Sequence, residues 1–485
     1  MSNNLFRVGE FYPPVEHQDR INRYKENKKL FKGLHHEVFG NFNGSDRNKE
    51  LLYISINLAG IICKKSADFL FGEAVRVKAG TGDATNEQKV LDSLIENNDM
   101  NILNYESALS NAYRGDSFYK IRYGQEHGGM LPKEIDIPRV IIEAQNAEFV
   151  FPEADLYNYS KIKAVHIAVP IHENESSNAG WILDVESHYA GYIEYRRFSM
   201  QAISFDARGN ASEWRITGEQ PEQNTVVATG VPYPLIVHIP NYSTDDTWEG
   251  IDDITEFRPI FDEINNRLSQ IASILDKHSD PALAVPSGIL GEDQDGRPTF
   301  RVAHDKVFEV MGKEDVIPQY ITWNGQLNEA FQELDRLVEL LLAAAEIPSV
   351  ALGKGDSGTS GASGLAIKWR MNSLLSKINR KRQYYMKGLK QVLLVAQLLD
   401  HAVGAADYKI VTPILQFQEG LPKDKMEEAN IMAIRTKGEK TMSLKSALML
   451  YDGITEEQAE TEINRIMTES QTIPNKEEEA SNQVA

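Results

Sequence analysis

The residues best suited to ligand chemistry lie in a glycine-rich segment at residues 353–364. Its first six residues, GKGDSG, have the GxGxxG spacing that brings backbone N–H groups close to the pyrophosphate of a dinucleotide. In such sites a buried strand precedes the motif, and an acidic residue follows about 20 positions later. Here a helical pattern ending at Pro348 precedes the motif, and no acidic residue occurs between Ser357 and Leu399. Nucleotide binding is therefore a minor alternative, and the composition favours a flexible loop.

Other reactive side chains lack the spacing that catalysis or metal binding needs. The sequence has no GxxxxGK[ST] phosphate-binding motif, no HExxH motif and no grouping of His and Cys at metal-ligand spacing. The serines of the glycine-rich segment have no GxSxG context. We expect the acidic pairs Asp252-Asp253 and Glu427-Glu428 to be solvated faces or favourable charges at helix N-termini. The prediction is no catalytic residue, no metal and no cofactor, so the chain is not expected to be an enzyme.

A cluster of cations follows the glycine-rich segment. The stretch between residues 357 and 399 contains no acidic residue, although the whole chain has 71 acidic and 51 basic residues and a formal charge of −20. Such a cluster can contact phosphate groups or acidic surfaces of other protein chains. Its eight members are Lys368, Arg370, Lys377, Arg380, Lys381, Arg382, Lys387 and Lys390.

Long helices must position both segments. Apolar residues recur at spacings of three and four over residues 259–278 and 327–346, which predicts two helices that are each apolar on one face. Residues 279–324 between them carry glycines, prolines and short β-like pieces, which predicts a small β-rich insertion at the tip of an antiparallel helix pair. A third long helix is predicted over residues 365–401, softly interrupted at Gly388.

The remaining patterns predict an α+β protein. Helices are expected in the N-terminal part over residues 16–32, 49–70 and 86–112. Strands are expected over residues 117–123, 140–142, 162–169, 191–198 and 231–239. After the third long helix we expect a strand over residues 408–417 and helices over residues 423–436, 443–451 and 455–468.

Composition excludes several protein classes. The chain has 485 residues, 41% of them apolar, which is enough for substantial cores. Its longest apolar run, near residues 392–399, is far shorter than the ~18 residues of a membrane span, and no secretory leader is apparent at Met1. Cys63 is the only cysteine, so no internal disulfide can form, and we expect a buried, inert thiol.

The order of these elements resembles the portal proteins of tailed phages of the SPP1 type. The similar pieces are NLAGIICKKSADFLFG at residues 57–72, AYRGDSFYKIR at residues 112–122 and INNRLS at residues 264–269. The succession of Ile347-Pro348, the glycine-rich loop and SGLAIK at residues 363–368 is the most specific of them. The resemblance extends over residues 48–468.

The resemblance implies a division of the chain into named parts. Residues 1–250 would form an α+β wing, and residues 251–278 and 325–346 would form the two stem helices. The β-rich clip would be residues 279–324, and the tunnel loop residues 347–364. Residues 365–418 would contribute a long helix and a return strand to the wing, residues 419–472 a helical crown, and residues 473–485 a disordered tail.

The resemblance also implies a function and partners. Portal proteins form rings of twelve subunits at one capsid vertex, which implies a conduit for packaging and ejecting double-stranded DNA and location in the virion, with assembly in the host cytoplasm. Terminase, head-completion or adaptor proteins, major capsid protein and scaffold protein are the implied partners, and no membrane is expected. The alternatives are another virion structural protein, such as a head-completion or minor capsid protein, or a nucleotide-binding enzyme that uses GKGDSG.

Two sets of residues acquire expected roles from this resemblance. We expect the eight cations to face acidic surfaces of neighbouring subunits rather than DNA, because tight phosphate contacts from many subunits would hinder sliding DNA. The tunnel loop is expected to project into the DNA channel. Its residues are Gly353, Lys354, Gly355, Asp356, Ser357, Gly358, Thr359, Ser360 and Gly361.

Overall fold

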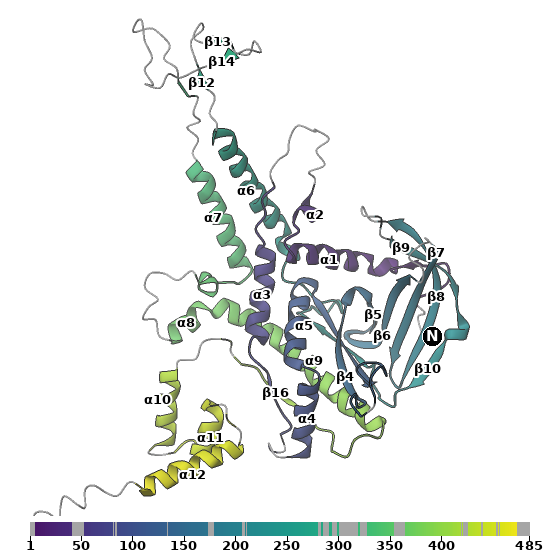
Figure 1. The fold of residues 1–485 in the computed structure, drawn as a ribbon, viewed down its shortest axis with the longest axis vertical. Helices are drawn as coiled ribbons and strands as arrows, with labels where there is room; N and C mark the ends of the chain where they lie inside the picture. The colour runs from purple at the N-terminus through teal and green to yellow at the C-terminus, as the bar shows by residue number, and fades with distance from the viewer. Residues whose placement is uncertain are drawn as a thin grey trace, which may run out of the picture.

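The computed structural model shows an α+β protein with two sheets, a projecting helix pair and a separate group of C-terminal helices (Figure 1). The α+β class predicted from sequence is confirmed. The structure describes all residues except 1–4, 41–52, 81, 83–84, 133, 173–178, 206–208, 210, 280–282, 285–290, 293–297, 300–318, 321–326, 354–363, 419, 421–424, 438–439, 453, 455 and 473–485.

A large antiparallel sheet lies at the side of the molecule away from the helix pair (Figure 1). Within the described residues its strand order is β1-β9-β8-β7-β6-β5, with β10 also paired to β8. Its inner face buries Phe151, Leu183, Phe198 and Trp214. The strands are β1 (Phe11–Tyr12), β5 (Val150–Asp155), β6 (Asn158–His172), β7 (Ala179–Tyr189), β8 (Tyr192–Phe205), β9 (Ala211–Glu219) and β10 (Thr225–Ala228).

A small sheet of order β11-β3-β4 lies at the centre of the main core and packs against helix α9. Helices α1, α3, α4 and α5 surround this core. The strands are β3 (Asp116–Gly124), β4 (Arg139–Gln145) and β11 (Ile236–Pro240). The helices are α1 (Val15–Phe31), α2 (His36–Phe39), α3 (Leu58–Phe71), α4 (Asn86–Asn97), α5 (Met100–Arg114), α8 (Gly364–Arg370) and α9 (Asn372–Ala402).

Helices α6 (Arg258–Ser279) and α7 (Leu327–Ala344) pack antiparallel and project from this core (Figure 1). An ion pair links them midway, with Arg267 Nη2 3.2 Å from Glu333 Oε1. The predicted antiparallel pair is therefore confirmed. Most of the predicted insertion lies outside the described residues, and its described parts are the short strands β12 (Leu283–Ala284), β13 (Gly291–Glu292), β14 (Pro298–Thr299) and β15 (Gln319–Tyr320).

The C-terminal helices form a group of their own at the opposite end from the tip of the α6–α7 pair (Figure 1). They are α10 (Lys425–Thr436), α11 (Leu444–Ala447), the π-helical turn η6 (Leu448–Asp452) and α12 (Glu456–Thr472). Before them, β16 (Ile414–Gln416) pairs with β2 (Arg76–Lys78). The predicted disordered tail, residues 473–485, lies outside the described residues.

Several sequence-based boundaries were wrong. Helix α3 begins at Leu58 rather than near residue 49, because the side chain of Asn57 accepts a hydrogen bond from Gly60 N and starts the helix there. The predicted helix over residues 365–401 is divided at Met371, which is buried in the main core. Strands β11 and β16 are shorter than predicted, and no prediction covered β5, β7, β9 and β10.

Gly388 does not interrupt helix α9. Its role is packing, because a Cβ atom at this position would lie 2.4 Å from Cγ1 of Ile239 on strand β11. The glycine thus lets the helix backbone approach the small sheet closely. This close approach fixes the position of α9 against the core, and with it the basic side chains along the helix.

Candidate functional site between helices α6, α7 and α9

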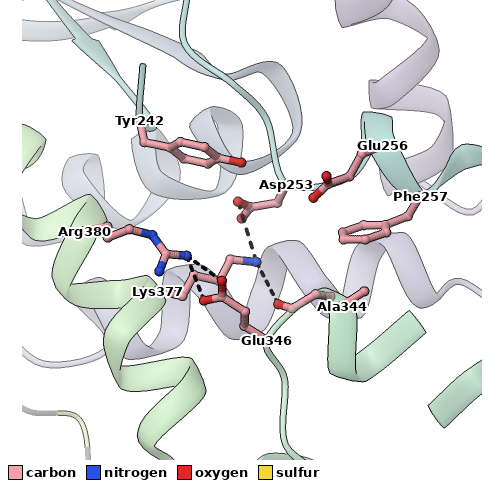
Figure 2. Close-up of a pocket in the computed structure, with 9 residues that line it drawn as sticks. Tyr242, Asp253, Glu256, Phe257, Ala344, Glu346, Lys377 and Arg380 are labelled. Atoms are coloured by element: carbon pink, nitrogen blue, oxygen red, sulfur yellow. Dashed lines mark hydrogen bonds and ion pairs between the residues drawn. The ribbon is translucent and has the colours of Figure 1, made fainter. Parts of the chain in front are cut away.

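A buried ion cluster joins helix α9 to the segment that leads into helix α6 (Figure 2). Asp253 lies just before α6 and is 3% exposed. Its carboxylate accepts a hydrogen bond from Lys381 Nζ and lies 3.7 Å from Lys377 Nζ. Asn241 Nδ2 donates a further hydrogen bond to it at 3.1 Å. Lys377 and Lys381 stand four residues apart, so one face of α9 presents both ammonium groups to the same carboxylate.

The charges of this cluster are strongly perturbed by burial. Burial alone would raise the pKa of Asp253, but the nearby charges of Lys377 and Lys381 outweigh it and lower the pKa to about 2. Burial lowers the pKa of Lys381 to about 8, although Asp253 acts in the opposite direction. Asp253 is therefore ionised at neutral pH. A buried pair of this kind adds little net stability, yet removing one partner leaves an uncompensated charge in the core.

The same face of α9 holds the end of helix α7. Lys377 Nζ donates a hydrogen bond of 3.1 Å to the carbonyl oxygen of Ala345, directly after the last residue of α7. A cation at a helix C-terminus also interacts favourably with the helix dipole. Lys377 thus contacts the ends of both projecting helices, through Asp253 before α6 and Ala345 after α7.

Glu346 continues this contact with an unusual backbone conformation. Its φ of 60° lies in the left-handed region, which costs an L-residue roughly 1–2 kcal/mol. Arg380 Nη2 lies 2.7 Å from both carboxylate oxygens of Glu346 (Figure 2). Both side chains are partly exposed, so their attraction is modest. The pair fixes the turn from which the chain continues to Pro348 and the glycine-rich loop.

The start of helix α6 is held by two further elements. Asp252 accepts hydrogen bonds from the N–H groups of Ile254 and Thr255 at 3.0 and 2.6 Å, which satisfies donors at the helix start. Arg258 Nη2 donates to Asn27 Oδ1 of α1 at 2.7 Å. The asparagine thereby joins the first long helix of the chain to the base of α6.

An extended segment, residues 53–56, runs along α6 and binds its side chains. Ile56 N donates to Asn265 Oδ1 at 3.2 Å, and Ile54 N donates to Ser269 Oγ at 3.0 Å. Asn265 and Ser269 are both buried. They satisfy backbone donors of a segment that lacks strand partners, which explains why polar residues interrupt the apolar face of this helix.

We define the junction site as Asp253, Glu346, Lys377, Arg380 and Lys381. Tyr242, Glu256 and Phe257 line the small pocket beside it (Figure 2). The two carboxylates pair with the three cations, and these pairs tie the segment before α6 and the end of α7 to helix α9. In the described part of the chain, His, Cys, Asp and Glu form no group of three that could hold a metal ion. Within the same residues, no helix is long and apolar enough to cross a membrane.

The family model of a phage portal protein, described as SPP1 Gp6-like, matches residues 14–476. The chain belongs to this family. It has the function of a phage portal protein, and the family is structural rather than enzymatic. Portal proteins are components of the virion capsid. No curated protein matches the chain.

The portal chain places the eight predicted cations in different environments. Lys377 and Lys381 are buried and form ion pairs with Asp253. Arg380 pairs with Glu346, and Arg382 Nη2 donates a hydrogen bond of 3.2 Å to the carbonyl oxygen of Phe69. These four therefore have partners within their own chain. The other four lie on exposed or half-exposed positions, namely Lys368, Arg370, Lys387 and Lys390. Their predicted role between subunits stays a prediction.

The predicted tunnel loop lies almost entirely outside the described residues. Gly353 is described and adopts a φ of 75°, a left-handed conformation that glycine adopts without strain. Residues 354–363 are not described, so their predicted position in the channel stays a prediction. What the structure shows is the anchoring of both flanks, through Glu346 on one side and the buried Met371 on the other.

Sequence reasoning missed the central member of the junction site. Asp253 was expected on a solvated face or as a favourable helix N-terminal charge. Its carboxylate is instead buried and forms ion pairs with two lysines. Asp252 does have the predicted helix N-terminal role. The sequence did contain a signal for a buried carboxylate. Lys377 and Lys381 stand four residues apart, and if that face of α9 is buried, the two lysines require a shared anion. Cys63 is buried, as predicted, and burial raises its pKa.

Proposed function

We propose that twelve copies of this chain form a ring at one capsid vertex, through which double-stranded DNA enters and leaves the capsid. In this proposal the body up to residue 250 is the wing, α6 and α7 are the stem, and residues 279–324 are the clip. Residues 347–364 form the tunnel loop, residues 365–418 the long helix and return strand of the wing, and residues 419–472 the crown. Terminase and head-completion proteins dock on the ring, which itself catalyses no reaction.

The observation that carries the proposal is the attachment of both projecting helices to α9 at the junction site. Two helices that project from a body need fixed bases if they are to define the wall of a channel. Lys377 fixes the bases of both helices, because it contacts Asp253 before α6 and the carbonyl oxygen of Ala345 after α7. Because a buried unpaired charge is costly, the helices cannot tilt away from α9 without a substantial penalty.

The same attachment supports our assignment of the tunnel loop. Glu346 and Arg380 fix its first residues, and the chain returns to the core at Met371. A loop between two fixed points can change conformation without moving the stem. We propose that it adjusts to passing DNA, with its small polar side chains touching the phosphate backbone weakly and without sequence preference.

Native mass spectrometry of the purified full-length protein tests the ring. We expect a complex of twelve chains of 54.6 kDa each. A single chain of 54.6 kDa at micromolar concentration would contradict the proposal. Titration with ATP separates the portal from a nucleotide-binding enzyme, because a conduit without nucleotide chemistry gives no saturable binding.

Deletion of residues 355–361 tests the loop. We expect the melting temperature and the ring to be unchanged, because the deleted residues contribute little to the core. A packaging reaction supplied with the motor should yield less DNA per capsid. If the shortened protein packages at the same rate and to the same length as the intact protein, the loop is only a connector.

Charge reversal tests the subunit role of the basic helix. Arg380→Glu with Arg382→Glu should weaken ring assembly more than it changes affinity for free DNA. These two arginines also have partners inside the chain, so Arg370→Glu with Lys387→Glu is the cleaner variant. Rings that persist in both variants while DNA binding collapses would assign the cations to DNA.

A further inference from the structure

The C-terminal helices have few buried apolar residues of their own. In the described part of residues 425–472, the buried apolar side chains are Ala447, Leu448 and Ala459. Helices α10, α11 and α12 and the turn η6 pack chiefly on one another (Figure 1). Domains of about 60 residues are already marginal in stability, and this group is smaller and has two alanines in a core of three residues. Its own packing cannot account for a stable fold.

The same helices leave apolar stripes exposed. On α12, Ile463, Ile466 and Met467 recur at spacings of three and four, and Met467 is 58% exposed. On α10, Ile431 and Ile434 stand three residues apart, and Ile434 is 75% exposed. Leu450 in η6 is also half-exposed. Exposed apolar side chains at helical spacing indicate a surface that another protein covers.

Charge separates the group into two complementary parts. The segment from the end of α10 to α11 carries Arg435, Lys437, Lys440 and Lys445, with Glu439 as its one acidic residue. Helix α12 carries Glu456, Glu457, Glu460, Glu462 and Glu469, with Arg465 as its one basic residue. Ion pairs join the two parts inside the chain, where Lys445 Nζ lies 2.7 Å from Glu456 Oε1 and also pairs with Glu460.

A ring needs two different surfaces on each chain that fit each other, because its subunits contact head to tail. The C-terminal group offers such a pair of surfaces. One is the acidic helix α12 with its apolar stripe, and the other is the apolar stripe of α10 together with the basic segment that follows it. A second copy of the same group therefore fits better than an unrelated partner. Among the described residues, contact with the rest of the chain is slight. The hydrogen bond from Lys445 is the main cause that lowers the pKa of Glu456, and the charge of Lys78 on β2 adds a smaller effect.

We propose that α10, α11 and α12 fold stably only in the assembled ring, where α12 of one subunit packs against α10 and α11 of the next. This inference rests on the proposed ring. It adds that the C-terminal group is built jointly by neighbouring subunits, while the body with α9 and the α6–α7 pair folds within one chain. Assembly then orders the group that we assign to the crown.

Hydrogen exchange of the full-length protein, measured separately on monomer and ring fractions, tests this. We expect amides of α10 and α12 to exchange about tenfold or more slowly in the ring than in the monomer. Amides of α3 and α9 should be protected in both fractions. Equal protection of α10 and α12 in both fractions, or no protection in the ring, would overturn the inference. Absence of any ring would instead contradict the proposed function, and the inference would fail with it.

A matched pair of variants assigns the protection to the apolar stripes. Ile434→Asp with Met467→Asp should remove the slow exchange of α10 and α12 while leaving α3 and α9 protected. The control is Ile137→Asp with Met130→Asp, which changes the same residue types at other exposed positions, on the β3–β4 connection. Rings of the control should retain protection. Retained protection in rings of the Ile434 and Met467 variant would overturn the proposed packing.

Discussion

The junction site and the C-terminal helices use lysine–carboxylate pairs in opposite ways. Asp253 and Lys381 are almost fully buried, with side chains 1% and 2% exposed, and each lies on a different structural element. Lys445 and its partners Glu456 and Glu460 are exposed to solvent at the surface of one small helical group. Water screens the second set but not the first, so the same chemistry ties helices together only at the junction.

This difference teaches where the chain is rigid by itself. The junction combines buried charges, a capped helix end and a glycine contact between α9 and β11, all within one chain. The C-terminal group has surface pairs and exposed apolar stripes. In the structure we propose for the ring, a subunit would carry a stem whose base is fixed before assembly and a crown that neighbouring subunits complete. Five substitution or pH experiments can break or sharpen this contrast.

The largest effect is expected for Asp253→Ala. It leaves two lysines of α9 buried without their anion, and loss of one partner of a buried pair costs about 3–5 kcal/mol. Chemical denaturation of the full-length protein should show this loss of unfolding free energy. The control Glu462→Ala, on the surface of α12, should change little. A loss below about 1 kcal/mol for Asp253→Ala would contradict the conclusion that the two buried lysines depend on this carboxylate.

A triple variant separates charge from packing at the same position. Asp253→Leu with Lys377→Met and Lys381→Met replaces the whole cluster with apolar side chains of similar size. Such replacements are often neutral or stabilising, so most of the stability lost in Asp253→Ala should return. If the triple variant is as unstable as the single variant, the cluster matters through its specific hydrogen bonds rather than through compensated charge.

Gly388→Ala is expected to cost about 1–3 kcal/mol, as overpacking of a buried contact does. The added Cβ would lie 2.4 Å from Cγ1 of the fully buried Ile239. Gly218→Ala is the matched control, because nothing lies within 4 Å of a Cβ at that glycine. Denaturation midpoints of the two variants check the prediction, and equal midpoints would mean that α9 can shift without cost.

Acid should weaken the junction. The pKa of Asp253 is lowered from 3.8 to about 2, so the unfolded chain takes up the proton first as the pH falls. The resulting stability, about 2 kcal/mol, is present above pH 4 and is lost as the pH falls toward 2. Denaturation at pH 5, 3 and 2 should show this loss. The triple apolar variant should lose less stability over the same range, because the contribution of Asp253 is missing while other acidic residues such as Glu186 still contribute.

The smallest effect is expected for Lys445→Ala. The exposed pairs with Glu456 and Glu460 are screened by water, so the unfolding midpoint should not move measurably. The shift of the unfolding midpoint in Asp253→Ala is the large effect with which this small one is compared. A clear loss of stability for Lys445→Ala in the monomer would mean that the C-terminal helices already fold within one chain.

The sequence predicted the helices well because their patterns are local. The apolar spacing over residues 259–278 and 327–346 identified α6 and α7, and Pro348 marked the end of the second. The start of α11 is equally local, because the side chain of Ser443 accepts a hydrogen bond from Ser446 N. Strands β7 and β9 were missed although each pairs with the neighbouring strand β8, because strand formation depends more on packing against partner strands than on the preferences of the residues themselves.

The junction site could be predicted only in part, for a physical reason. The cluster of cations on α9 is visible in the sequence, but their partner Asp253 lies more than a hundred residues earlier. Local pattern gives the charge of a helix face and not what covers it. Gly388 shows the same limit, since a glycine inside a helix pattern suggests interruption until Ile239 is placed against it.

Electron micrographs of the purified full-length protein test the central claim most directly. We predict class averages that show closed rings with a central hole, with stems attached at a fixed angle in every subunit. The Asp253→Leu, Lys377→Met, Lys381→Met variant should form the same rings, whereas Asp253→Ala should give few or irregular ones. Isolated particles the size of one chain, with no ring for the unmodified protein, would contradict the account.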